Sequence, residues 1–139
     1  MSAVAVIRYL LANAAAVTAV VPATRILPGV PPVNTAMPAL AVTKISGTEA
    51  LTVAMTESGR MHTERVQVTA YVKQAQAAGT DYPGLEALLT LVGAACANRN
   101  GTVNGVRVDS ILPAGEGPDI PPDESMILER SRDFIVKWL

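Results

Sequence analysis

The chain's only histidine stands close to an acidic residue. His62 and Glu64 are two positions apart in the run HTER, so their side chains share a face if this run is an extended strand. A histidine that acts as a general base needs a partner that orients it. Pairs at this spacing are common without a catalytic role, and we therefore expect His62 to be a solvated residue at the start of a strand.

The only cysteine, Cys96, falls on the leucine-rich side of a predicted helix. A nucleophilic cysteine needs an electropositive, partly open site, whereas this position favours a small, buried hydrophobic side chain. A single cysteine cannot form a disulfide within the chain, so no oxidising compartment is implied. One histidine and one cysteine also cannot supply the ligands of a closed zinc site.

Four acidic residues and no basic residue lie in the segment Pro113–Glu124, PAGEGPDIPPDE. A calcium loop places its acids at alternating positions before a glycine, and this segment does not. We expect a solvated loop, with an electrostatic docking contact as the alternative. The sequence also contains no dinucleotide fingerprint and no nucleophile elbow. We therefore predict no catalytic, cofactor-binding or metal-binding residue, and no enzyme activity.

The composition favours one domain over residues 1–139. Half of the residues are hydrophobic but only 4% are aromatic, which suits a thin sheet with helices packed close against it. The net charge of −1 lacks the positive surplus that phosphate binding requires, and it favours association. Arg8 and Asn13 interrupt the apolar run Ala3–Ala23, and no basic residue precedes it, so we expect a soluble helix rather than a signal peptide or membrane span.

The spacing of apolar residues predicts two main helices and several strands. Ala3–Ala12 reads as a mostly buried helix with Arg8 toward solvent, and Asn13 as the cap of a short second helical piece. The second main helix is expected at Tyr82–Ala97. The predicted strands are Arg25–Leu27, Ala39–Ser46, Met61–Lys73, Val106–Leu112 and Ser125–Leu139, with a weaker edge strand or hairpin arm in Gly47–Gly59.

Met61–Lys73 is the clearest interior strand, because apolar residues occupy every second position from Val66 to Val72. Asn104-Gly105 marks a hairpin turn. We therefore predict an α+β fold, with one mixed, mainly antiparallel β-sheet of about 4–6 strands and two main helices packed on one face.

The closing strand is apolar on both faces. Phe134, Val136 and Trp138 share one face, and Ile135 and Leu139 share the other. Such a strand is either central in the sheet or packed against a neighbouring subunit.

The order of these elements, and the phrases within them, resemble the tail terminator (tail completion) proteins of long-tailed, siphovirus-type bacteriophages. LLANAAAVTAVV followed by RILPG resembles the opening helix pair and first strand of that family. MPALAV resembles its proline-led second strand, ERVQVTAYV its central strand and SRDFIVKWL its closing strand. The resemblance covers nearly the whole chain and rests on the order and spacing of these phrases.

The resemblance implies a structural virion protein that is assembled in the host cytoplasm. Members of the family form a ring, typically a hexamer, on the head-proximal end of the tail tube. The ring ends tube polymerisation and joins the tail to the head, without a cofactor or a membrane. The implied partners are further copies of the chain, the major tail tube protein and the head–tail connector, while DNA passes through the lumen without specific binding. A ring of this kind closes through heterologous contacts.

As residues of an oligomer or partner interface we predict the acids of the loop and two aromatic residues of the closing strand: Glu116, Asp119, Asp123, Glu124, Phe134 and Trp138. Three other interpretations remain open. The chain is alternatively a head–tail connector or stopper protein of the neck, an enzyme or ligand-binding domain with a pocket over the sheet, or a non-viral oligomeric module.

Overall fold

The computed structural model describes residues 2–50, 61–73, 82–120 and 126–139, and their strands form one six-stranded sheet. The strands are β1 (Ile26–Pro28), β2 (Ala39–Ala50), β3 (Met61–Lys73), β4 (Gly101–Val103), β5 (Val106–Glu116) and β6 (Ile127–Trp138). The helices are α1 (Ala3–Ala12), α2 (Ala15–Thr18), the 3-10 turn η1 (Ala23–Arg25) and α3 (Tyr82–Cys96). The strand order is β1-β2-β3-β6-β5-β4, and only β1 and β2 pair in parallel. The predicted mixed, mainly antiparallel α+β fold is confirmed.

Polar side chains close both ends of α1. The Ser2 hydroxyl accepts a hydrogen bond from the backbone N–H of Ala5 at 3.2 Å, as an N-cap residue does. At the other end, the Asn13 side-chain amide donates to the carbonyl of Tyr9 at 2.8 Å. The prediction that Asn13 caps the second helical piece was wrong, because the N-cap residue of α2 is Ala14, which makes no side-chain cap.

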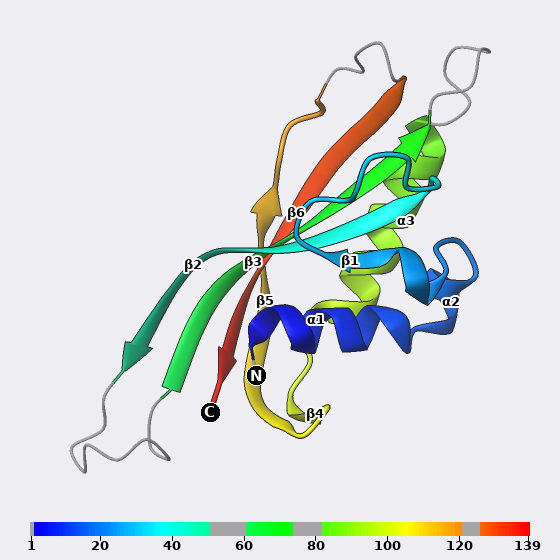
Figure 1. Cartoon of the computed structure of the whole chain (residues 1–139). Helices are drawn as coiled ribbons and strands as arrows, with labels where there is room; N and C mark the ends of the chain where they lie inside the picture. Colours follow the sequence, from blue (N-terminus) through cyan, green and yellow to red (C-terminus); the bar gives the residue numbers. More distant parts are fainter. Residues whose placement is uncertain (1, 51–60, 74–81, 121–125) are drawn as a thin grey trace.

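One face of the sheet carries the core, and the helices cover it. Val66, Val68 and Ala70 of β3 are buried, and in the neighbouring strand Phe134 stands opposite Val66. These side chains form one cluster with the buried faces of α1 and α3. The three α-helices lie next to one another on this side of the strands (Figure 1). Full burial of each larger apolar side chain stabilises the fold by about 1.5–3 kcal/mol.

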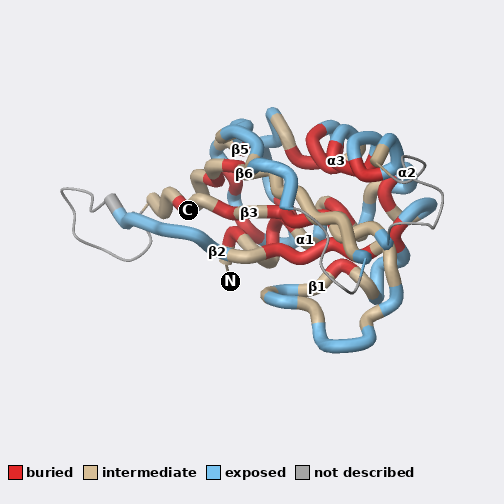
Figure 2. Tube along the Cα trace, turned by 90° about the horizontal axis from the view of Figure 1, so that it is seen from above, coloured by how far each residue is buried: buried red, intermediate tan, exposed pale blue. Residues whose placement is uncertain are grey.

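The closing strand β6 is central, between β3 and β5. Its even-numbered residues face the helices, and its odd-numbered residues face the opposite side together with Arg65 and Gln67 of β3. We call this uncovered side of the sheet the outer face. Figure 2 shows that the second half of β2, residues 44–49, is exposed, whereas the centre of the sheet is buried.

Two strands extend further than predicted. β2 continues to Ala50, and the rest of the predicted hairpin arm lies outside the described residues. β5 continues through Pro113 to Glu116, where we expected a loop. Gly117 and Ile120 then donate backbone hydrogen bonds to Ser131 and Glu129 of β6, at 2.9 and 3.0 Å. An edge strand tolerates proline where its missing N–H would face away from the sheet, so Pro113 did not end the strand.

A buried carboxylate joins four parts of the fold. Glu64 of β3 is 6% exposed, and it accepts hydrogen bonds from the backbone N–H of Ala3 at 2.9 Å and the indole Nε1 of Trp138 at 2.7 Å. The Lys44 ammonium lies 3.0 Å from its other oxygen. Burial by itself raises the pKa of Glu64, but the hydrogen bonds from Trp138, Lys44 and Ala3 and the charge of Lys44 outweigh it, so the pKa lies below its ordinary value.

Glu64→Gln should therefore destabilise the fold and change its pH dependence. Because the pKa of Glu64 is lowered on folding, its contribution is present above the unfolded-state pKa of about 4.3 and is lost as pH falls through the folded-state pKa. We expect the variant to lose about 1.5–3 kcal/mol at neutral pH and to lose less further stability than the wild type below the unfolded-state pKa. Urea unfolding at a series of pH values measures both effects, and equal pH slopes for the two proteins would contradict this role.

Candidate functional site

We expected His62 to be a solvated residue, but in the structure it is part of a cluster of side chains. Its ring stacks on the indole of Trp138, with centroids 4.1 Å apart and planes 13° from parallel. Its Nδ1 lies 3.4 Å from a carboxylate oxygen of Glu49. The nearby Glu64 carboxylate is occupied by three other donors, so it does not orient His62 as the acid of a catalytic pair would.

Cys96 is buried, as its place on the leucine stripe predicted. Burial raises the pKa of its thiol to about 12, which outweighs the opposing charges of Arg99 and Arg132. A thiol in this state is a poor nucleophile. Within the described ranges, no group of histidine, cysteine and acidic side chains is placed to hold a metal ion, and no helix combines the length and apolar character needed to span a membrane.

The two aromatic residues predicted at an interface lie within the chain's own packing. Phe134 is fully buried, which leaves none of its surface for a partner. Trp138 is half-buried between its contacts to His62 and Glu64. Both side chains therefore act first on the fold.

Of the four predicted acids, the structure describes Glu116 and Asp119. Asp123 and Glu124 lie outside the described residues, and Glu116 is exposed at the end of β5. Asp119 instead accepts hydrogen bonds from Arg130 Nε and from the Tyr82 hydroxyl, both at 2.7 Å. These contacts tie the segment that follows β5 to the start of α3.

The hydrogen bonds of Asp119 shift three pKa values. Donation first from Arg130 and then from Tyr82 lowers the pKa of Asp119. The hydrogen bond to Asp119 is also the leading cause that raises the pKa of Tyr82, and the leading cause that raises the pKa of Arg130. Arg130 also lies 3.4 Å from Glu86 of α3 and 5.4 Å from the centroid of the Tyr82 ring. Asp119 is thus bound within its own chain, and its place in an interface stays a prediction.

No helix in the part of the chain that the structure describes covers the outer face of the sheet (Figure 1). At its centre, Arg65 donates to Asp133 at 2.9 Å and to the carbonyl of Ala114 at 3.0 Å. Beside them, the Gln67 amide donates to the Ser131 hydroxyl at 3.1 Å. These pairs satisfy several of the polar groups at the centre, while the buried Oδ1 atom of Asp133 has no hydrogen-bond partner among the described residues.

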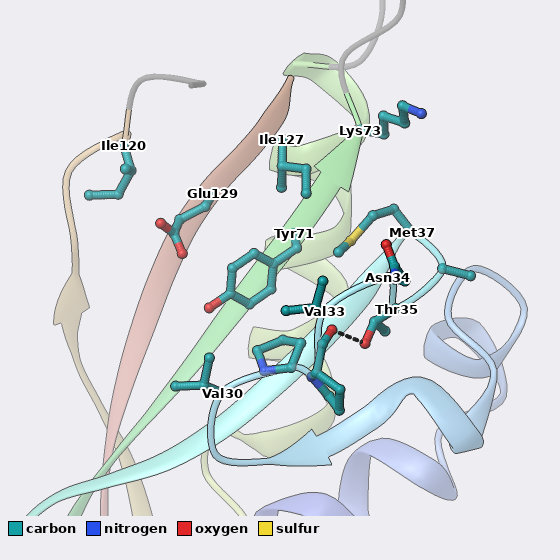
Figure 3. Close-up of a pocket in the computed structure, with 13 residues that line it drawn as sticks. Val30, Val33, Asn34, Thr35, Met37, Tyr71, Lys73, Ile120, Ile127 and Glu129 are labelled. Carbon is teal, nitrogen blue, oxygen red and sulfur yellow. Dashed lines mark hydrogen bonds between the residues drawn. The ribbon is translucent and has the colours of Figure 1, made fainter. Parts of the chain in front are cut away.

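A proline loop, residues 29–38, forms one wall of a hollow at the end of this face. The Gly29 N–H donates to the Val42 carbonyl at 2.9 Å, and Arg25 donates to the carbonyl of Met37 at 3.3 Å, so the loop is fixed at both ends. Thr35 closes an inner turn on the carbonyl of Pro32 (Figure 3). The hollow has a volume of about 690 Å³.

The floor and opposite wall of the hollow come from three further segments. Tyr71 of β3 and Glu129 of β6 form its polar floor, and Ile120 stands on the far side (Figure 3). Burial, together with the Glu129 carboxylate, raises the pKa of Tyr71 to about 12. None of these lining residues was predicted from the sequence, because they lie far apart in the chain. The available signals were the polar alternate positions of β3 and the three prolines around Met37.

Comparison with known proteins identifies the fold. No protein-family model matches the sequence, and no curated protein matches it. A solved structure, described as the virion of a native gene transfer agent (GTA) particle, contains a chain that superposes with a TM-score of 0.70. The alignment covers 99% of this chain and 94% of that chain at 14% sequence identity. The superposition shows that the two chains share a fold over nearly their whole lengths. An identity this low shows the shared fold alone.

Asp119→Asn should bring the pKa of Tyr82 back toward its ordinary value, because the carboxylate that accepts the phenolic hydrogen is removed. Titration of tyrosinate absorbance in the wild type and the variant measures the change, and Tyr82→Phe identifies which titration belongs to this residue. Glu116→Gln is the matched control and should leave the tyrosine titration unchanged. An Asp119→Asn titration identical to that of the wild type would contradict the link.

Proposed function

We propose that this chain is a structural protein of a phage-like virion, and that it acts as a tail terminator. In this role, copies of the chain close into a ring, with six copies as the family resemblance implies, on the end of the tail tube. The ring stops further polymerisation of the tube and joins it to the neck. DNA passes through the ring without specific binding.

The observation that carries this proposal is the fold match along the whole chain. A chain of a gene transfer agent virion has the same arrangement over 99% of the present sequence, and the apolar phrases of the sequence follow the order of the tail terminator family. Agreement of the complete fold and of the phrase order supports the same kind of part in the same kind of particle. A chain with this fold serves in an assembled particle, and this supports an assembly role for the present chain.

The surfaces of the molecule support an assembly role as well. The helices that the structure describes all cover one side of the sheet. β1 pairs with only the first part of the long strand β2, Leu40–Val42. Open strand edges and uncovered faces are places where other chains add. Two different surfaces on one chain are what a heterologous, ring-closing contact requires.

The alternative within the virion is a connector or stopper protein of the neck. The same fold match supports it, because the match is to a chain of a whole particle. Binding to the end of the tail tube separates the two roles, since a terminator contacts the tube directly and a stopper contacts the portal side.

The purified chain should form closed rings, and it should bind the ends of tail tubes. Negative-stain electron microscopy at high protein concentration checks closure, and the expected result is uniform rings with a central hole. Mixing the chain with tubes assembled from the tail tube protein of the same particle should give capped tubes of limited length. A capped end should then add no further tube subunits.

Two outcomes would count against the terminator role. Chains that neither close nor bind tube ends would contradict it. Chains that bind the purified connector but leave tube growth unchanged would move the assignment to the neck. Tubes incubated with Phe134→Asp, in which a charge is placed in the buried core, provide a control for effects of unfolded protein.

A further inference from the structure

The outer face carries two unpaired cations at one end. Arg107 alternates with the buried Val106 and Val108, and Lys137 alternates with the buried Val136, so both side chains face away from the core. Among the described residues, neither side chain has an ion pair or a hydrogen bond. The backbone N–H of Leu139 donates to the carbonyl of Arg107 at 2.9 Å, which places an apolar side chain, 41% exposed, beside the two cations.

The hollow at the opposite end of the same face is largely apolar and holds one carboxylate, that of Glu129, beside Tyr71. Its charged floor residue is Glu129, whereas the side chain of Lys73 extends outward at the rim (Figure 3). Val30 and Val33, on the fixed proline loop, are 84% and 91% exposed. A loop held in place with two valines in water gains nothing for its own fold, and such apolar exposure marks a docking surface.

The centre of the face is electrically neutral. Arg65 and Asp133 pair with each other at 2.8 Å, and the neighbouring pair of Gln67 and Ser131 is uncharged. Asp109, exposed at the bulge of β5, pairs with neither Arg107 nor Lys137. The face therefore presents Arg107, Lys137 and an apolar side chain at one end, and the Glu129 carboxylate beside exposed valines in the hollow at the other, separated by a stretch whose charges are paired.

We propose that the outer face binds a second copy of this chain, with Arg107, Lys137 and Leu139 of one copy seated in the hollow around Glu129 of the next. The cations meet the carboxylate, and Leu139 packs on Val30 and Val33. Complementary charges of this kind set the register of a contact and select the right partner. The inference deepens the proposed ring and rests on it, because each copy offers both ends and the contact can repeat head to tail.

Charge reversal at either end should weaken self-association, and combining the reversals should restore it. We expect Glu129→Lys alone and the pair Arg107→Glu with Lys137→Glu alone each to weaken association by about tenfold or more. An equimolar mixture of the two variants should associate as strongly as the wild type, because each then meets an opposite charge. Sedimentation velocity over a range of concentrations gives the association constants, and added salt should weaken the wild-type contact.

The matched control is Arg99→Glu, which changes the net charge as Arg107→Glu does but alters an exposed side chain just after α3, outside the hollow. It should leave association unchanged. Restoration in the mixture also excludes misfolding as the cause of the loss, since an unfolded variant is not repaired by a partner. Glu129→Gln, which keeps the size of the side chain, should weaken association less than Glu129→Lys.

Three results would overturn this inference. They are a wild-type chain that does not associate, reversed variants that associate as the wild type does, and a mixture that stays as weak as its components. Capping of tail tubes by variants that no longer self-associate through this face would leave the proposed function standing and remove only this contact. Loss of capping with intact self-association would leave this contact standing and count against the proposed function.

Discussion

The fold depends on a carboxylate that three donors neutralise inside the protein. An ionised group in the interior is costly unless it is paired and hydrogen-bonded, and Glu64 meets the start of α1, the indole of β6 and the ammonium of β2 at the same point. Because its donors come from segments distant in the sequence, the cost of burial is offset only when all of them are in place. The carboxylate therefore fixes how the first helix is placed on the end of the sheet.

That placement decides which surface remains for assembly. With α1 anchored over one side of β3, the helices and the apolar side chains gather on that side, and the polar alternate residues of β3 and β6 remain on the other. Internal pairs then satisfy several of the polar groups at the centre of the outer face, such as Arg65 with Asp133. What is left for a partner lies at the ends of the face, where apolar side chains and unpaired charges are exposed. The position of the core thus determines which face of the sheet is left for the proposed contact.

Local sequence patterns predicted the helices and strands. They did not predict which residues, distant in the sequence, contact one another in the fold. The alternation in Met61–Lys73 predicted β3 to the residue, and helical spacing predicted α3 to within one residue. The expectation that Arg8 faces solvent was wrong, because its guanidinium donates to the carbonyl of Ile26 at 3.2 Å. Gly93 gave no signal either, yet a side chain there would collide with the Arg132 guanidinium packed under α3. In both cases the partner lies far away in the sequence.

The predicted interface residues show why residue type alone does not identify a docking site. An acidic residue in a polar loop reads the same whether its partner is another chain or its own, and Asp119 was found bound to Arg130 and Tyr82 of its own chain. Phe134 has the apolar character of an interface residue, but its side chain is fully buried in the core. Glu129, unremarkable in the sequence, enters the proposed contact because the fold places it in one hollow with the exposed valines of the proline loop. A docking site is defined by what the fold leaves unsatisfied, and that property becomes visible only after the internal contacts have been assigned.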